Sequence, residues 1–237
     1  MKHLCILIVY DNINEIKLCF ESIYQDNIDF FIIENKSENT EKIKEYFLQK
    51  NLKGYILFEK NIAANAVNIF IRDFYELMHE YDYITLTDGD FYVYDSKSLF
   101  NELILNLNNK NVVISSADLY LQNNYNRNDR IVGIDYYIDM MKNRKVENGY
   151  NVKHTANNFV TLKKENLFLL KNLYYLDTNL INKVKEIEKI WVATKNNLVY
   201  HLTWDLYFDG NPYYEFKKKH IDKIWKIMED STYQKII

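Results

Sequence analysis

Short apolar runs alternate along the first half of the chain with stretches in which apolar residues recur every three or four positions. Continuous apolar runs are typical of strands covered on both faces, and the spaced pattern is typical of amphipathic helices. The predicted strands cover residues 4–10, 30–34, 54–58 and 83–87, and the predicted helices cover residues 14–25, 40–50 and 63–79. Regular alternation of strand and helix predicts an α/β fold with a central, mostly parallel sheet flanked by helices.

The second half has a less regular pattern. It predicts helices over 96–107, 165–171 and 217–229, strands over 112–117, 154–162 and 192–202, and a polar loop over 122–129. The chain contains no internal repeat and no linker rich in Pro, Gly or Ser. We therefore expect one domain over 1–237, with a regular half at 1–95 and a less regular half at 96–237.

The amino-acid composition indicates a folded globular protein. Hydrophobic residues make up 48% of the 237 positions and proline occurs once, which is typical of a folded globular chain. A net charge of −3 predicts no general attraction to nucleic acid. Cys5 and Cys19 fall in a predicted strand and helix, where buried thiols of a reducing compartment are expected. The N-terminus is unlike a signal peptide and no apolar stretch reaches membrane-spanning length, so we expect a cytoplasmic protein.

Asp88-Gly89-Asp90 directly follows the strand predicted over 83–87. Side chains alternate along a strand, so carboxylates one residue apart are expected on one side of the backbone. The intervening glycine lacks a Cβ and lets an anion approach the main chain. Two carboxylates and a diphosphate form the all-oxygen environment that Mg²⁺ or Mn²⁺ prefers. The sequence thus predicts a metal and nucleotide-diphosphate site.

Two other polar pairs, Tyr10-Asp11 and Glu34-Asn35, also stand where predicted strands end. Ligands of open α/β sheets bind beyond the carboxyl ends of the parallel strands. We therefore expect these pairs to meet Asp88-Gly89-Asp90 along one edge of the sheet.

With these residues placed, the first 95 or so positions resemble the GT-A glycosyltransferases, most closely the family 2-like enzymes of bacterial surface-polysaccharide type. The features that match are Tyr10 at the first strand end, Glu21-Ser22-Ile23, Glu34-Asn35-Lys36-Ser37, a loose match over Asn61 to Asn68, and the Asp-x-Asp motif Asp88-Gly89-Asp90. The resemblance implies a metal-dependent transfer of a sugar, hexosyltransferase in type, from a nucleotide-diphosphate donor, with a UDP-sugar favoured.

The resemblance also implies roles for individual residues. Tyr10 and Glu34 would contact the nucleotide base, and Asp88 the ribose or a metal-bound water. Asp90 would bind Mn²⁺ or Mg²⁺ directly, with His201, and with Asp88 as a further candidate. The remaining donor-binding candidates are Asp11, Asn61 and Gly89.

The family's catalytic carboxylate has no clear counterpart in the second half. Asp205 is the first candidate for the base and Asp118 the second, because a carboxylate can take the proton from an acceptor hydroxyl. The expected outcome is inversion in a single displacement. The acceptor would be a glycan or lipid-linked hydroxyl, as in polysaccharide biosynthesis.

Other interpretations remain open. A haloacid-dehalogenase-like phosphatase would use Asp88 as nucleophile and Asp90 as acid/base, although that motif usually ends the first strand of its fold. A non-catalytic nucleotide- or carbohydrate-binding module is another, and an acidic turn capping the next helix is the plainest. The helix predicted over 217–229 could lie on the inner face of the membrane or pack on the domain or a second subunit.

Overall fold

The structure is a computed structural model, and it describes most of the chain. The described residues are 1–63, 65–120, 133–152, 159–171, 176–203, 210, 215 and 231–237. Several sequence predictions lie outside them: the loop over 122–129, the first residues of the strand over 154–162, the base candidate Asp205 and the helix over 217–229.

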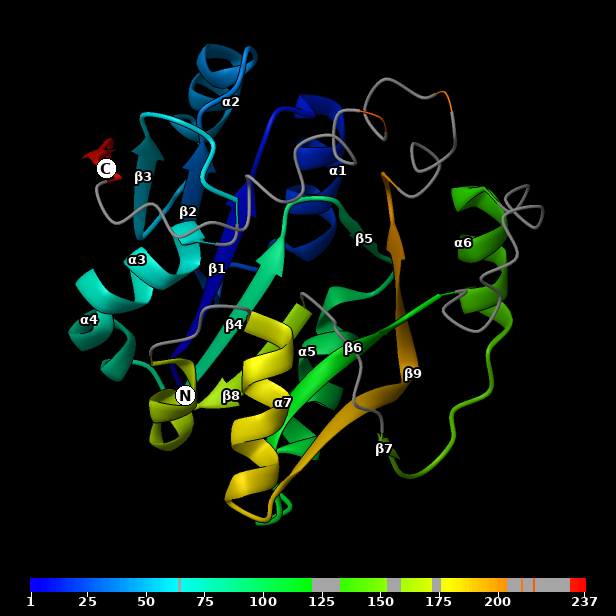
Figure 1. Cartoon of the computed structure of the whole chain (residues 1–237). Helices are drawn as coiled ribbons and strands as arrows, with labels where there is room; N and C mark the ends of the chain where they lie inside the picture. The colour runs from blue at the N-terminus through cyan, green and yellow to red at the C-terminus, as the bar shows by residue number, and fades with distance from the viewer. Residues whose placement is uncertain are drawn as a thin grey trace.

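A sheet of ten strands forms the centre of the described molecule (Figure 1). Its strands are β1 (His3–Val9), β2 (Asp29–Asn35), β3 (Gly54–Phe58), β4 (Tyr83–Asp88), β5 (Phe91–Val93), β6 (Val112–Leu119), β7 (Asn151–Val152), β8 (Phe159–Lys163), β9 (Ile190–His201) and β10 (Tyr233–Lys235). The helices are α1 (Ile13–Ile23), α2 (Thr40–Phe47), α3 (Asn65–Asp73), α4 (Tyr75–His79), α5 (Ser96–Asn106), α6 (Ile134–Asn143), α7 (Leu176–Glu186) and the 3₁₀ helix η1 (Lys164–Leu170).

The strand order is β10-β3-β2-β1-β4-β8-β6-β9-β5, with β7 paired to β9. Strands β3, β2, β1 and β4 are parallel, so their carboxyl ends lie at one edge. Strand β8 runs antiparallel to β4 on one side and to β6 on the other, and it joins the two halves of the sheet. The arrangement confirms the predicted α/β class with a mostly parallel first half.

Helices cover both faces of the sheet (Figure 1). One core contains buried residues of α3, η1 and α7, and the other contains buried residues of α1, α2 and α5. Strand β1 contributes alternate residues to each core: Leu4 and Ile6 to the first, Cys5 and Leu7 to the second. This explains why the sequence of β1 is apolar from Leu4 onward, because helices cover both faces of the strand.

The structure departs from the sequence predictions at several elements. The helix predicted over 63–79 is two helices, because the backbone at Phe74 leaves helical geometry (φ −117°, ψ 21°) while its ring stacks on Phe70. The helical stretch predicted over 165–171 is the 3₁₀ helix η1. The sequence analysis did not predict β5, β7, β10, α6 or α7. None of the described helices combines the length and the apolar character needed to cross a lipid bilayer.

Candidate active site

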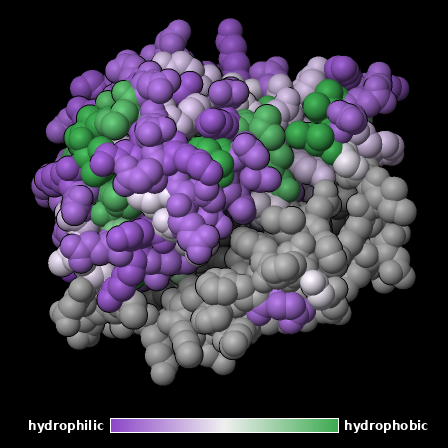
Figure 2. All heavy atoms as spheres, turned by 90° about the horizontal axis from the view of Figure 1, so that it is seen from above, coloured by the Kyte–Doolittle hydropathy of each residue, from purple (hydrophilic) through white to green (hydrophobic). Residues whose placement is uncertain are grey.

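The carboxyl ends of the parallel strands bring the predicted strand-end residues to one edge of the sheet. Glu34 pairs with Val9 across β2 and β1, and Asp88 pairs with Ile8 across β4 and β1. Figure 2 views the molecule from above, and the described surface visible there is largely hydrophilic with separate hydrophobic patches. The edge is therefore where a polar ligand would meet the parallel strands.

Gly89 occupies a position that leaves no space for a side chain. Strand β4 ends at Asp88, and the Gly89 N–H donates to the Ile8 carbonyl at 2.7 Å. A Cβ at Gly89 would lie 2.9 Å from Val9 Cγ1 and 3.1 Å from the Ile8 oxygen. The glycine thus allows the turn that precedes Asp90 to pack against the end of β1. The absence of a side chain at Gly89 is therefore needed for the packing of this turn, independently of any anion binding.

The Asp90 carboxylate meets two residues from the end of β9 and just beyond it. The Thr203 hydroxyl donates to Asp90 Oδ2 at 2.8 Å, and His201 Nε2 lies 3.7 Å from the same oxygen. Thr203 Oγ1 and His201 Nδ1 are 3.3 Å apart. The backbone supports this contact, because the Leu202 N–H donates to the Asp90 carbonyl at 2.7 Å and Phe91 pairs with His201.

The other Asp90 oxygen, Oδ1, is buried and accepts no hydrogen bond from any residue that the structure describes. A buried carboxylate oxygen without a donor is costly unless a cation or a donor satisfies it. The carboxylate is the kind of ligand that both Mn²⁺ and Mg²⁺ prefer, and an imidazole is a ligand for a transition metal such as Mn²⁺ rather than for Mg²⁺; phosphate and water oxygens would complete the coordination. Asp90 and His201 therefore fit a divalent cation.

The described residues do not show a third protein ligand grouped with Asp90 and His201, so a metal-binding role for Asp88 stays a prediction. Within the described ranges no group of three His, Cys, Asp or Glu side chains is placed to bind one metal ion. The expectation that Asp88 and Asp90 share one side of a strand fails because β4 ends at Asp88 and Asp90 lies in the following turn. Alternation with period two applies only while the backbone remains extended.

Two loops at this edge adopt left-handed backbone at residues other than glycine, Asp11 (φ 63°) and Ala63 (φ 50°). Each is fixed by an asparagine: Asn39 Nδ2 donates to Asp11 Oδ1 at 3.0 Å, and Asn61 Oδ1 accepts from the Ala63 N–H at 2.9 Å. Asn35 adds a second bond to the latter loop, accepting from the Ile62 N–H at 3.0 Å. Such strained positions concentrate at functional sites. Asp11 and Asn61 thus shape the edge through the conformation of its loops.

Glu34 lies at the predicted strand end, but its side chain is 0% exposed. The Tyr55 hydroxyl donates to Glu34 Oε2 from the neighbouring strand β3. Burial raises the pKa of Glu34 to about 7, although the Tyr55 and Thr40 hydroxyls lower it. A contact between Glu34 and a nucleotide base would require this side chain to rearrange. Tyr10 lies at the edge and is half-buried, and its carbonyl accepts from the Asn12 N–H at 2.9 Å.

Asp118 lies at the same level of the sheet as Asp88, on the far side of β8. Val160 of β8 pairs with Leu86 and with Ser116, so the residues two positions later, Asp88 and Asp118, are level. Two inter-strand spacings separate their strands, about 10 Å. Asp118 is 5% exposed, and its N–H donates to Thr194 Oγ1 at 2.9 Å. The described structure therefore brings Asp118 to the edge, whereas Asp205 lies outside the described residues.

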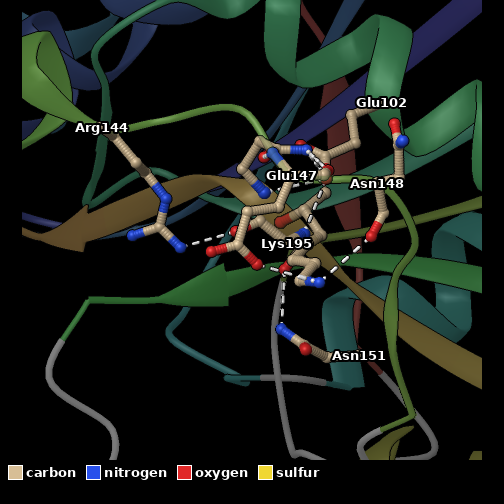
Figure 3. A network of polar contacts seen from close by, with 8 residues as sticks. Glu102, Arg144, Glu147, Asn148, Asn151 and Lys195 are labelled. Atoms are coloured by element: carbon tan, nitrogen blue, oxygen red, sulfur yellow. Dashed lines mark hydrogen bonds and ion pairs between the residues drawn. The ribbon is translucent and has the colours of Figure 1, made fainter.

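A polar network lies beside this edge around residues 194–197 of β9 (Figure 3). The Glu102 carboxylate of α5 accepts from the backbone of Lys195, Asn196 and Asn197. Arg144 Nη2 donates to the Lys195 carbonyl at 2.6 Å, and Lys195 Nζ lies 2.9 Å from Glu147 Oε2. The sequence analysis singled out neither Glu102 nor Thr203. The sequence carried no alternation signal for Thr203, because β9 ends at His201 and Thr203 lies in the following turn.

Comparison with known proteins supports the fold and leaves the activity open. No family model matches the chain. It is 31% identical over 97% of its length to "Uncharacterized protein L137" of Acanthamoeba polyphaga mimivirus, and 30% identical over 92% to "Uncharacterized protein L142" of the same virus. The chain spans 33% of the first relative and 47% of the second. Neither relative's name assigns an activity.

Among solved structures, the chain is similar to a Desulfovibrio desulfuricans G20 protein assigned as a nucleotide-diphospho-sugar transferase. The TM-score is 0.50 at 8% identity, over 94% of this chain and 97% of that one. A weaker likeness, TM-score 0.39 at 14% identity, relates 81% of the chain to 45% of the glycosyltransferase GlyE of Streptococcus pneumoniae TIGR4. The first comparison shows the fold: a central sheet flanked by helices, similar to that of nucleotide-sugar transferases.

Proposed function

We propose that the chain is a metal-dependent glycosyltransferase that binds a nucleotide-diphosphate sugar at the carboxyl edge of β1, β2 and β4. The observation that supports it is the meeting of Asp90 with His201 and Thr203, which lie more than a hundred positions later in the sequence. A carboxylate and an imidazole at the strand-end edge of a fold similar to that of nucleotide-sugar transferases support a site for a diphosphate-bound cation.

The hydrogen bonds around His201 favour metal binding through Nε2. The Thr203 hydroxyl has one proton, which it donates to Asp90. In a neutral imidazole, the contact between Thr203 Oγ1 and His201 Nδ1 then makes Nδ1 the protonated nitrogen. In that tautomer Nε2, which lies 3.7 Å from the Asp90 carboxylate, is the nitrogen that could bind a metal ion. Two acceptors facing each other at this distance suit a shared cation, and Thr203 acts as the outer partner that orients both.

In this proposal each residue of the edge has a defined task. A bound Mn²⁺ or Mg²⁺ would neutralise negative charge on the departing diphosphate. Asp90 and His201 bind that ion, and Asn35 and Asn61 fix the loop beside the nucleotide. Asp118 or Asp205 takes the proton from the acceptor hydroxyl as it attacks the anomeric carbon, which inverts the configuration there. A UDP-sugar donor and a glycan or lipid-linked acceptor are the proposed substrates.

The first test is thermal unfolding with UDP, GDP, CMP and TDP, each with Mn²⁺ and again with EDTA. A ligand that binds only the folded state stabilises it, by about 2.7 kcal/mol at a hundred times Kd. We expect one nucleotide to raise the Tm in a metal-dependent way. Asp90→Asn should abolish that increase.

A matched control is Asp82→Asn, which removes a carboxylate at the opposite end of β4 that is 47% exposed. Its metal-dependent increase in Tm should equal that of the unmodified chain. If no nucleotide changes the Tm, the transferase proposal is wrong. Release of phosphate from p-nitrophenyl phosphate would then favour the phosphatase, and absence of any turnover would favour a binding module.

A further inference from the structure

Strand β9 contains more residues than the strand beside it. Ser116 pairs with Ala193 and Asp118 pairs with Leu198, so β6 advances two residues while β9 advances five. Residues 194–197 therefore form a large bulge that adds three residues to β9. The bulge lies between the part of β9 in the core and the part that reaches the candidate active site.

A single carboxylate accepts hydrogen bonds from the backbone N–H groups of this bulge. Glu102 Oε1 accepts from the N–H groups of Lys195 at 2.7 Å and Asn196 at 2.9 Å, and Oε2 accepts from the N–H of Asn197 at 2.9 Å. The side-chain amides of Asn196 and Asn197 donate to the same carboxylate, at 3.3 and 2.6 Å. Glu102 is 9% exposed. Such charge-assisted bonds are among the strongest hydrogen bonds in proteins, and five converge here.

The offset of three residues decides which side chains reach Asp90. Because strand side chains alternate, an odd offset moves every later residue to the opposite face of the sheet. With the bulge, His201 pairs with Phe91 directly after Asp90. Without it, Leu198 would pair with Phe91 and His201 would lie three residues further along. An apolar side chain would then stand where the imidazole now faces the carboxylate.

We infer that Glu102 is a positioning residue, which fixes the register of β9 and so places His201 and Thr203 beside Asp90. The inference rests on the proposed function for the role of those three residues, but the register itself does not.

The outer contacts of the network are exposed to solvent, unlike those of Glu102. The ion pair of Lys195 with Glu147 is exposed, with 63% of the Glu147 side chain accessible (Figure 3). Exposed pairs of this kind contribute little.

The register can be measured without any ligand. The rings of Phe91 and His201 contact each other edge to face, with centroids 5.1 Å apart. In protein with isotope labels on Phe and His, this contact should give a nuclear Overhauser effect between the two rings. The signal is assigned by its absence from the His201→Ala variant. Glu102→Gln keeps the size of the side chain but turns one acceptor into a donor that faces N–H groups. We expect Glu102→Gln to lose the effect and Glu147→Gln to keep it.

A rescue variant separates loss of register from general unfolding. Deleting Lys195, Asn196 and Asn197 in the Glu102→Gln chain removes the three additional residues, so Ala193 and Leu198 keep their partners without the carboxylate. This variant should regain the Phe91–His201 contact. If Glu102→Gln retains the contact, or the deletion does not restore it, the inference is wrong.

Binding of Mn²⁺ followed by electron paramagnetic resonance connects the register to the site. Glu102→Gln should weaken Mn²⁺ binding at least tenfold, and Glu147→Gln should leave it unchanged. In a background that carries both His201→Ala and Thr203→Ala, Glu102→Gln should have no additional effect, because Glu102 acts through these two residues. An additional loss there would contradict the inference. If the unmodified chain binds no Mn²⁺, the proposed function fails while the register measurement still decides the role of Glu102.

Discussion

The environment of Glu34 makes its charge dependent on pH within the physiological range. Burial raises the pKa of its carboxyl from 4.5 to about 7; the Tyr55 and Thr40 hydroxyls and Lys44 lower it, and Glu41 raises it. Between these two values the folded chain binds more protons than the unfolded chain. The contribution of Glu34 to stability is therefore complete below about pH 4.5 and decreases as the pH rises to about 7.

Glu34→Gln should remove this dependence, because glutamine does not titrate and still offers an oxygen to Tyr55. We expect the free energy of unfolding of the variant, relative to the unmodified chain, to rise by about 3 kcal/mol between pH 4.5 and 8. Urea denaturation of both proteins across this range measures the difference. Burial of His3, whose pKa falls to about 4, affects both proteins equally. Parallel curves would show that the pKa of Glu34 is the same in the folded and the unfolded chain, which would contradict this prediction.

Gly89 is the residue of the Asp-x-Asp motif whose replacement should affect the fold most directly. Gly89→Ala places a Cβ 2.9 Å from Val9 Cγ1 and 3.1 Å from the backbone oxygen of Ile8. The backbone cannot yield as a flexible side chain can, so we expect a loss of about 1–3 kcal/mol in the free energy of unfolding. Chemical denaturation measures it.

Gly133→Ala is the matched control, because a Cβ at Gly133 meets nothing within 4 Å and its φ of −67° suits alanine. Gly133→Ala should lower the free energy of unfolding by less than about 1 kcal/mol, as expected at an N-cap position. Equal losses at Gly89 and Gly133 would mean that the turn before Asp90 adjusts freely to a side chain.

Among the elements, α5 has a structural role that its sequence shows only in part. It packs against β6 and β9 and carries Glu102 to the bulge. Its first turn is capped by Asp95, whose side chain accepts from the Ser98 N–H at 3.0 Å. The pattern of Ser96 to Leu107 predicts the helix but not the destination of Glu102, because the bulge lies 93 to 95 residues later in the chain.

Asp95→Ala should lower the free energy of unfolding by about 1 kcal/mol, because it removes the acceptor of an N-terminal helix N–H. Asn12→Ala is the comparison, since Asn12 occupies the same position of α1 without a side-chain capping bond. Its effect should be clearly smaller. The two variants can be compared by urea denaturation at one pH. An effect of Asn12→Ala as large as that of Asp95→Ala would contradict the role assigned to the Asp95 cap.

Elements buried on both faces were those that the sequence predicted best. Strands β1 to β4 consist mainly of apolar residues because helices cover each face, and β3 was predicted with the bounds that the structure has, 54–58. The sequence analysis did not predict β5 and β10, which are three residues long and form only by pairing with β9 and β3. The break at Phe74 is a local change of backbone conformation, and it leaves no signal in the sequence because apolar residues continue at helical spacing through it, at Phe70, Phe74 and Met78.

At the scale of the whole molecule, the edge of the candidate site could be predicted but its contacts could not. Parallel topology brings the ends of β1, β2 and β4 together, so the placement of Asp88 and Glu34 follows from strand order. The contact between Asp90 and Thr203 joins positions 113 residues apart and depends on the register of β9. The burial of Glu34 depends in the same way on Tyr55 of the next strand. Partners of this kind are determined by packing between distant segments.

The sheet and both cores pass without interruption from the first half of the described chain to the second. Strand β8 pairs with β4 on one side and β6 on the other, and the first core contains Leu4 together with Trp191. A chain divided into independent halves would need separate cores. We therefore predict that residues 1–95 and the second half unfold as one cooperative unit.

Native-state hydrogen exchange tests this prediction by reporting the opening free energy of individual segments. Backbone amides of β1 and of the central part of β9 should exchange with the same free energy, equal to that of global unfolding. Addition of urea should lower both in parallel, since both would open by exposing the whole core. If the opening free energies of β6 and β9 were several kcal/mol lower than those of β1 and β2, the second half would be a separate unfolding unit. The candidate site between Asp90 and His201 would then form by docking of one unit on the other.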